Sequence, residues 1–533
     1  MNERAWIATI IGVGLLLRLG VAFAPFGWQL QHILPDDAFY YFTIARNIAE
    51  GNGITFDGVV QTNGFHPLWM GAIVPFWELL PGELLPIRAV LLLGALLDLG
   101  TVVLLYRVGL LLGWRRSLRL GIPATHAASP LLIAHFGTMN GLETSATVML
   151  LSLFLYFYLR LLLGNNPGNN PSDWRWLGLS AGLALLARVD TLFLVAPLLL
   201  HLLLNLRPTW RQLCWVVVVP TALLVPWMLW LLATFGTLRQ SSGEALQFMA
   251  TRFLWGDSPS VWDWLGQWGA NVAAVLRTIP IPFLGKPQIL ACWGVVAGVA
   301  GWNVLSLFTL RRNKPQPNTG AEAFNSLLVV MMLCVGLLLF VVAHTIYGGV
   351  MRSWYCTLLY PWVVVMLGMG INHQLQLRVL GRARGWHPAI SAVAVGLLLG
   401  LGSWNGWNRE GGENLKFKGA MNVRAMIESA PDSLKPTAVA AWNAGVVGYF
   451  LPTVRVLNLD GVVNHHATAA AAESRLAEYA ATNHVTLLID DPETLRVWAK
   501  HWREGCNNIS DELATADTVA DGKRVLLVGR LGD

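Results

Sequence analysis

Residues 91–112 read LLLGALLDLGTVVLLYRVGLLL, and this apolar run is long enough to cross a lipid bilayer as a single helix. Runs of similar character occupy residues 213–235 and 327–343. A helix rises about 1.5 Å per residue, so about 20 residues span a hydrocarbon core of roughly 30 Å. A membrane β-barrel would instead show alternating segments of about 10 residues, and these runs do not alternate. The sequence therefore predicts a polytopic α-helical membrane protein.

The composition of the whole chain agrees with a membrane location. Of its 533 residues, 55% are hydrophobic and 13% are charged, and the mean hydropathy is +0.51. A soluble domain carries about 25% charged residues. The net charge of +6 comes from short basic clusters between apolar runs, which is the pattern of cytoplasmic loops and not of a nucleic-acid-binding surface. The clusters are Arg115, Arg116 and Arg119; Arg207 and Arg211; Arg311, Arg312 and Lys314; and Arg378, Arg382 and Arg384.

Together with the apolar runs, these clusters predict about eleven crossings of the plasma (inner) membrane, with the amino terminus cytoplasmic and the carboxyl end outside. The first run resembles a signal peptide, but Arg18 interrupts it and no small-residue cleavage site follows, so we expect an uncleaved span. Segment 67–80 is short and contains Pro75, which favours an interfacial or re-entrant helix over a crossing. The expected spans are 5–24, 86–112, 121–138, 142–163, two within 176–206, 213–235, 288–310, 324–345, 357–377 and 388–407.

The character of the chain changes near residue 408, where the apolar runs shorten to strand length. Short β-branched runs that alternate with helical stretches predict a small α/β domain with a largely parallel sheet. We therefore expect a transmembrane catalytic domain at 1–407, with an outer loop at 25–66, and an extracytoplasmic α/β domain at 408–533. The expected strands are 437–441, 454–457, 485–489 and 525–528, and the expected helices are 467–481 and 492–503.

The outer loop at 25–66 carries the first candidate catalytic residues, Asp36 and Asp37, directly beyond the first span. Adjacent carboxylates can bind a divalent cation, or one of them can act as a general base. The alternative is structural, because an Asp before Ala-Phe-Tyr-Tyr also suits the start of a helix. The helix that follows presents Tyr40 and Arg46 as candidates for substrate binding.

Further candidates lie at the end of this loop and in the next outer turn. Asn63 and His66 belong to the segment TNGFHPLW, where His66 either binds a phosphate or plays a structural role beside Trp69. Glu143, in the segment NGLET, either caps the helix that follows or joins Asp36 and Asp37 in a three-carboxylate site for Mg²⁺ or Mn²⁺.

The remaining candidates are charged or aromatic residues within or beside apolar runs. Arg188 and Asp190 lie inside the stretch 176–206, where ionisable residues are costly and normally functional, although a purely structural pair is the alternative. On another outer loop, His344, Arg352 and Tyr355 could hold a phosphate. The sequence contains no Walker loop, no zinc-type cluster of His and Cys, and no G-x-S-x-G motif, so we expect no nucleotide cofactor.

The outer loop, from its double Asp to Gly64-Phe65-His66-Pro67-Leu68-Trp69, resembles that of GT-C fold glycosyltransferases. This group includes the protein mannosyltransferases, the lipid A aminoarabinose transferase and the mycobacterial arabinofuranosyltransferases. The likeness covers roughly residues 1–200. The arabinofuranosyltransferase-like branch fits more closely because of the double Asp, the GLET segment and the outer α/β tail. Segments 442–450 and 458–464 are similar to those of uncharacterised bacterial members.

The resemblance implies a glycosyltransferase, hexosyl or pentosyl, that uses a polyprenyl-phosphate sugar as donor and a glycan, lipid or protein as acceptor. Transfer would invert the anomeric centre, with Asp36 or Asp37 deprotonating the acceptor hydroxyl. Glu143 would place a metal ion or the acceptor, and Arg188 or Arg352 would hold the donor phosphate.

Two other classes of protein remain as alternatives. A transporter or flippase of a lipid-linked or polar substrate also uses many spans and intramembrane charge, but it predicts broken helices in two related halves, and the sequence shows no such symmetry. A non-catalytic polymer-assembly or sensor protein would use the α/β tail as its binding module.

Overall fold

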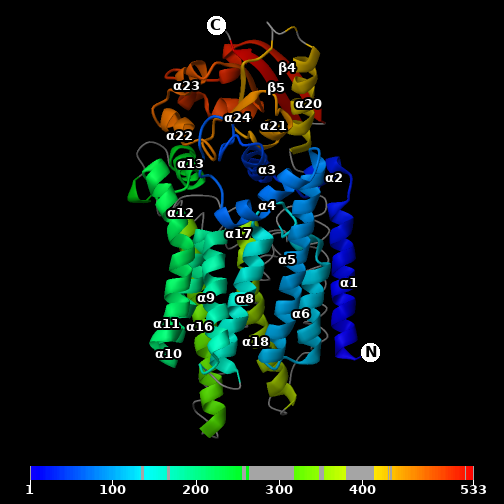
Figure 1. Ribbon diagram of the computed structural model, residues 1–533, viewed down its shortest axis with the longest axis vertical. Helices are drawn as coiled ribbons and strands as arrows, with labels where there is room; N and C mark the ends of the chain where they lie inside the picture. Colours follow the sequence, from blue (N-terminus) through cyan, green and yellow to red (C-terminus); the bar gives the residue numbers. More distant parts are fainter. Residues whose placement is uncertain are drawn as a thin grey trace.

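A computed structural model shows a helical bundle with a smaller sheet-containing domain at one end (Figure 1). The structure describes residues 2–133, 137–164, 168–254, 260–262, 317–346, 353–379, 413–429, 431, 435–521 and 524–531. The predicted spans at 288–310 and 388–407 lie outside these residues, as does the predicted domain boundary at 407/408.

Within the described residues, five segments of the bundle are long and apolar enough to cross a membrane. The chain is therefore a membrane protein, as the sequence predicts, whereas the predicted number of eleven crossings is not confirmed. The segments are α1 (Glu3–Ala22), α5 (Leu84–Leu111), α8 (Thr144–Leu163), Val189–Leu206 with α10 (Leu192–Leu206), and Trp210–Phe235 with α11 (Trp210–Leu213), the π-helical turn η2 (Cys214–Val218) and α12 (Val219–Phe235).

Other helices complete the bundle. The predicted span 121–138 is divided into α6 (Arg116–Ala128) and α7 (Pro130–Ile133), because Pro130 keeps the preceding Ser129 out of the helical conformation. The predicted pair within 176–206 is present as α9 (Pro171–Ala187) and α10, with Arg188 and Asp190 at the turn. The remaining helices of this part are α16 (Pro317–Ile346), α17 (Ser353–Leu358) and α18 (Tyr360–Val379).

The amino terminus and the C-terminal domain lie at opposite ends of the bundle (Figure 1). Arg119, from the first basic cluster, pairs with Glu3 at 2.5 Å, so this cluster lies beside the amino terminus. That placement agrees with the prediction that both lie on one side of the membrane.

A group of three ionisable side chains is enclosed within the bundle. Arg18 of α1 donates from Nε to Asp98 of α5 at 2.8 Å, and His126 of α6 lies 2.8 Å from the other carboxylate oxygen. None of the three is exposed. The charge that interrupts the first apolar run is therefore compensated by a charge in the second span.

Short helices lie between the bundle and the C-terminal domain (Figure 1). They are α2 (Phe26–His32), α3 (Asp36–Ala49), α4 (Pro67–Leu79) and α13 (Ser241–Met249). With 13 residues, α4 is too short to cross a bilayer, as the sequence predicts for segment 67–80.

The C-terminal domain contains a five-stranded sheet in the order β2-β1-β3-β5-β4. The strands β2 (Arg455–Asn458), β1 (Ala438–Ala441) and β3 (Val485–Asp490) are parallel, but β5 (Arg524–Leu531) and β4 (Leu513–Asp521) are antiparallel, so the sheet is mixed. Its helices are α20 (Glu413–Ser429), α21 (Gly445–Phe450), α22 (His465–Ala472), α23 (Leu476–Thr482), α24 (Pro492–Val497) and α25 (Ala499–Trp502).

The C-terminal domain is docked on the outer loop through α21 and α3. Asp36 accepts hydrogen bonds from the amides of Gly445 at 3.1 Å and Val446 at 3.0 Å, so it caps the start of α21. Arg46 donates to the carbonyl of Tyr449 at 2.7 Å, near the end of the same helix. The residue that precedes α3 is Pro35, and no side-chain hydrogen bond caps that helix. Asp36 therefore caps a helix about 400 residues away in the chain, and not its own.

Candidate active site

Arg188 is the centre of a buried charged cluster at the turn between α9 and α10. Its Nη1 donates to Glu143 Oε1 at 2.6 Å, and its Nε and Nη2 donate to the two oxygens of Asp190 at 3.0 and 2.6 Å. The guanidinium lies 4.3 Å from the centre of the Tyr355 ring. Arg188 is only 5% exposed, so these contacts replace the water that would otherwise solvate its charge.

Two histidines extend this cluster. His344 of α16 places Nε2 3.1 Å from an oxygen of Asp190, and His66 places Nε2 3.8 Å from Glu143. The structure thus brings together six of the twelve site residues named from the sequence. We call the set Glu143, Arg188, Asp190, His344, Tyr355 and His66 the Arg188 cluster.

The turn that carries Glu143 depends on a glycine. Gly141 has a φ of +79°, and a Cβ added there would lie 2.8 Å from the ring of Phe42 on α3. Its carbonyl accepts a hydrogen bond from Trp69 of α4 at 3.0 Å. The residue at this position must adopt the left-handed conformation without a side chain, which favours glycine. Gly141 therefore lets α3 and α4 pack against the turn that places Glu143.

Two polar atoms of the Arg188 cluster, Glu143 Oε2 and His66 Nδ1, have no hydrogen-bond partner among the residues that the structure describes. Buried polar atoms are nearly always hydrogen-bonded, so these atoms indicate where a polar ligand can bind. Burial lowers the pKa of His66, although the charge of Glu143 opposes this effect. A neutral imidazole can donate from one nitrogen and accept at the other.

Asp37 lies half-buried in the first turn of α3. Burial raises the pKa of Tyr355, and the negative charges of Asp190 and Asp37 add to the effect. On the other side, burial raises the pKa of Asp460 to about 7, and the charges of Asp37 and Asp36 contribute. Asp37 is therefore within electrostatic reach of both groups.

Asp460 was not among the candidates from sequence, although its segment was noted. It follows β2, at the carboxyl edge of the three parallel strands. Ligands bind at this edge in many α/β sheets, which is the signal that could have identified it.

Tyr40, Arg46 and Asn63, which were expected to bind substrate, instead hold the outer loop against the C-terminal domain or against α13. The Tyr40 hydroxyl accepts from the Ala444 amide and from Asn458 Nδ2, both at 3.1 Å. Arg46 binds α21, as described above. Asn63 accepts from the Ser241 amide at 2.8 Å and thereby holds the start of α13. Arg352 lies outside the described residues.

The structure does not unite Asp36, Asp37 and Glu143 in a metal centre. Asp36 accepts two amide hydrogen bonds and lies 3.5 Å from Lys416 Nζ, whereas Glu143 pairs with Arg188. Within the part of the chain that the structure describes, no group of three or more His, Cys, Asp or Glu residues is placed to hold a metal ion. These residues therefore do not fit the expected Mg²⁺ or Mn²⁺ site.

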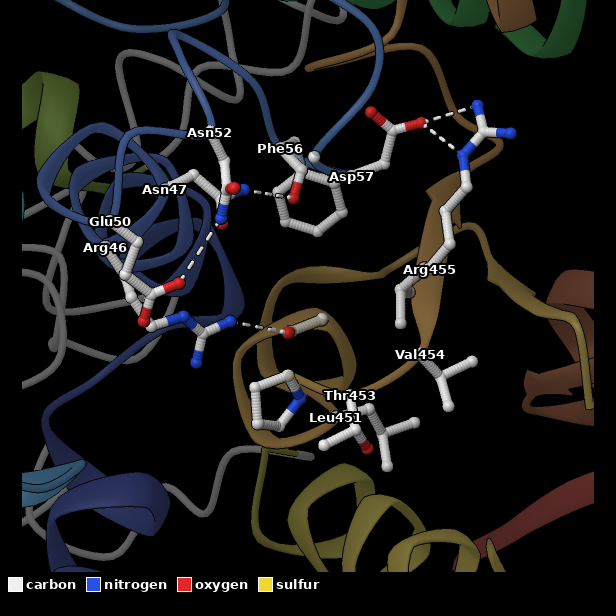
Figure 2. Close-up of a pocket in the computed structure, with 14 residues that line it drawn as sticks. Arg46, Asn47, Glu50, Asn52, Phe56, Asp57, Leu451, Thr453, Val454 and Arg455 are labelled. Carbon is white, nitrogen blue, oxygen red and sulfur yellow. Dashed lines mark hydrogen bonds and ion pairs between the residues drawn. The ribbon is translucent and has the colours of Figure 1, made fainter. Parts of the chain in front are cut away.

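A polar cavity of about 220 Å³ lies at the seam between the outer loop and the C-terminal domain (Figure 2). Asp57 and Arg455 face each other across it, with Arg455 Nε donating to the carboxylate at 2.9 Å. Arg46, at the far end of α3 from Asp37, also lines it. Neither Asp37 nor Glu143 lines this cavity, which is therefore separate from the Arg188 cluster.

Comparison with known proteins connects this architecture to membrane glycosyltransferases. Neither family models nor curated protein sequences match the chain. ArnT from Cupriavidus metallidurans, solved with undecaprenyl phosphate, matches over 99% of this chain and 98% of its own, with 14% identity and a TM-score of 0.50. The apo oligosaccharyltransferase of Archaeoglobus fulgidus matches over 96% of this chain and 73% of its own, with 11% identity and a TM-score of 0.51.

Both matches extend over nearly the whole chain, so they include the bundle and the C-terminal domain together. At sequence identities of 14% and 11%, these matches show a shared fold but do not show shared site residues. The closer likeness to the arabinofuranosyltransferase branch stays a prediction from the sequence. The chain has the GT-C fold of these integral-membrane glycosyltransferases.

Proposed function

We propose that the protein is an integral-membrane glycosyltransferase that moves a sugar from a polyprenyl-phosphate donor to an acceptor hydroxyl outside the cytoplasm. The observation that carries this proposal is the position of Asp37 beside the Arg188 cluster, in a GT-C fold. ArnT, which shares this fold, was solved with undecaprenyl phosphate, and that supports a lipid-phosphate donor here. The amino terminus would be cytoplasmic and the C-terminal domain extracytoplasmic, in the plasma membrane.

The reaction needs a base and a group that stabilises the leaving phosphate. Asp37 takes the proton of the acceptor hydroxyl, and the acceptor oxygen attacks the anomeric carbon on the face opposite the phosphate. The bond from that carbon to the phosphate oxygen breaks, and its electron pair leaves with the polyprenyl phosphate. The product therefore has the inverted configuration. Asp36 is less suited to be the base, because its oxygens accept the α21 amides.

Arg188 is the described cation best placed for the donor phosphate. Guanidinium groups bind phosphate oxygens through paired N–H donors. Its Nη1 now donates to Glu143, so the phosphate would exchange with Glu143 at this nitrogen. His344 contacts Asp190 through Nε2 and the Phe340 carbonyl through Nδ1, so it helps to hold Asp190 beside Arg188. The sugar is either a hexose or a pentose, and the acceptor is a glycan, lipid or protein.

The proposal is tested by replacing Asp37 with Asn in membranes supplied with a panel of radiolabelled polyprenyl-phosphate sugars. We expect wild-type protein to release polyprenyl phosphate from one donor and Asp37→Asn to lose about 10²- to 10⁴-fold in rate, because the general base is absent. Donor binding should be retained, since the substitution removes no contact to the phosphate. Asp57→Asn, in the same outer loop, is the matched control and should keep its turnover.

Two outcomes would contradict the proposal. Equal turnover by wild type and Asp37→Asn would exclude Asp37 as the base. Movement of a labelled lipid across the membrane with no bond broken would favour the transporter.

A further inference from the structure

The loop that follows β2, residues 459–464, is held at both ends against the outer loop. On one side, Asn458 Nδ2 donates to the Tyr40 hydroxyl at 3.1 Å. On the other side, the Val462 carbonyl accepts from Ser241 Oγ at 2.9 Å, and a Cβ added at Gly64 would lie 2.2 Å from the same carbonyl. Asp460 lies midway between these two contacts. The loop is therefore fixed in place beside the start of α3.

Asp460 is a buried carboxylate without a basic partner in the described residues. It is 8% exposed and accepts a hydrogen bond from the Val462 amide at 2.9 Å. Three other carboxylates at this junction have cations: Asp36 has Lys416, Asp57 has Arg455, and Glu143 has Arg188. A buried charge without a cation is costly, so this carboxyl group has a reason other than stability to be here.

The position of Asp460 in the sheet also favours a role in ligand binding. The carboxyl ends of β1 and β2 lead directly into the residues that contact α3, with Gly445 bound to Asp36 and Asn458 bound to Tyr40. Side chains at this edge of parallel strands commonly face a ligand. In this protein the edge contacts Asp36 and Tyr40 in the first part of α3, the helix that also carries Asp37, so we assign the C-terminal domain to the outer side of the candidate active site.

We propose that Asp460 belongs to the active site, where its carboxyl group binds a hydroxyl of a carbohydrate acceptor and holds that acceptor beside Asp37. This inference rests on the proposed function and assigns the acceptor side of the site to the C-terminal domain. Asp37 takes the proton of the attacking hydroxyl, as above, while Asp460 binds a neighbouring hydroxyl and undergoes no net change. Carboxyl groups suit this task because they accept hydrogen bonds from hydroxyls and, when protonated, also donate.

The test measures acceptor and donor kinetics separately in the full-length protein. The probes are a series of octyl glycosides as acceptors and the radiolabelled polyprenyl-phosphate sugar that the wild type uses. For Asp460→Asn we expect the KM for the octyl glycoside to rise about 10- to 100-fold, the range expected for one lost hydrogen bond to a charged group. The KM for the donor should stay within about twofold of wild type, because the phosphate contacts are untouched.

Two further variants separate binding from structure. Asp460→Glu keeps the carboxyl group and should recover part of the acceptor affinity. Asp57→Asn breaks the ion pair with Arg455 across the same interface and should leave the KM for the octyl glycoside unchanged. A purely structural role would instead raise both KM values together, or would give the same result in Asp57→Asn.

Three results would overturn the inference. They are an unchanged acceptor KM in Asp460→Asn, a parallel change in donor and acceptor KM, and wild-type transfer that depends on Asp37 but never uses an octyl glycoside. Each of these leaves the proposed function intact. Failure of the proposed function is distinct, because it appears as the absence of any turnover that depends on Asp37.

Discussion

Arg188 lies at a turn between apolar helices, and its guanidinium is divided between Glu143 and Asp190. We expect Arg188→Met to destabilise the protein by about 3–5 kcal/mol, because two buried carboxylates lose their cation. Thermal unfolding in detergent would measure the loss. Glu143→Gln should partly restore the stability of Arg188→Met, since it removes one of the two uncompensated charges. Strictly additive effects of the two substitutions would show that the pair is not coupled.

Asp460 should make stability depend on pH. Burial raises its pKa to about 7 from the ordinary 3.8, and the charges of Asp36 and Asp37 act in the same direction, while hydrogen bonds from Val462 and Asn458 oppose them. Between about pH 4 and about pH 7 the folded protein therefore binds a proton that the unfolded chain has released, so stability falls as the pH rises.

The measurement compares the free energy of unfolding of wild type and Asp460→Asn at about pH 5 and about pH 8. Between these two pH values the wild type should lose up to a few kcal/mol more stability than the variant. Burial also raises the pKa of Asp490, to about 6, but this group is present in both proteins and cancels in the comparison. Parallel pH profiles for the two proteins would contradict the prediction.

The sequence allowed some of these residues to be identified and not others, for a physical reason. Arg188 and Asp190 were recognised because ionisable groups in an apolar run need an explanation. Asp460 sits in a polar loop, where an acidic residue is ordinary. It becomes buried only when the loop docks on the outer loop, and that contact is not visible in one sequence.

Helix α21 is held by opposite charges at its two ends. Asp36 accepts from the amides at its start, and Arg46 donates to a carbonyl near its end, which matches the direction of the helix dipole. We expect Asp36→Ala to weaken the docking of the C-terminal domain by about 1–2 kcal/mol, the usual cost of a lost N-cap. Faster limited proteolysis of the domain would report this change.

Glu50→Ala is a suitable control for that experiment, because it removes an exposed carboxylate at the other end of α3. Its rate of proteolysis should match that of wild type. Equal rates for Asp36→Ala and wild type would show that the cap does not contribute to docking.

Among the strands and helices, the apolar segments were predicted best. The expected strands at 437–441, 454–457, 485–489 and 525–528 correspond to β1, β2, β3 and β5. Strand β4 was missed because its sequence, LATADTVAD, lacks a continuous apolar run and gains order by pairing with β5. The expected helix at 467–481 is divided into α22 and α23, with Ser474 between them at a φ of +54°.

The two halves of the molecule meet closely at Gly64, where the outer loop touches the backbone of Val462. We expect Gly64→Ala to separate the halves at this point at a cost of about 1–3 kcal/mol, because the added methyl group would overlap a carbonyl oxygen that belongs to the backbone. Lower thermal stability and faster release of the C-terminal domain by protease would show this.

Gly71→Ala is the matched control, since nothing lies within 4 Å of a Cβ at this helical position of α4. It should leave stability unchanged or raise it slightly. If Gly64→Ala and Gly71→Ala behaved alike, the close approach would not restrict the interface.

The division of the chain into a helical bundle and an α/β domain could be predicted from apolar run length. The way these parts join could not. Asp36, Tyr40 and Arg46 contact residues of the C-terminal domain about 400 positions away in the chain. No local sequence pattern predicts such long-range contacts. The antiparallel edge of the sheet depends equally on a pairing that the sequence does not display.

The ion pair between Arg18 and Asp98 has a consequence for how the protein is made. The first helix leaves the ribosome with a charge whose partner is synthesised 80 residues later. An arginine without a partner inside an apolar helix costs free energy to insert through the translocon. Helix α1 would therefore wait at the insertion machinery until α5 arrives, and the two would enter the lipid together. Membrane integration of the amino terminus would then depend on the second span as well as on the first.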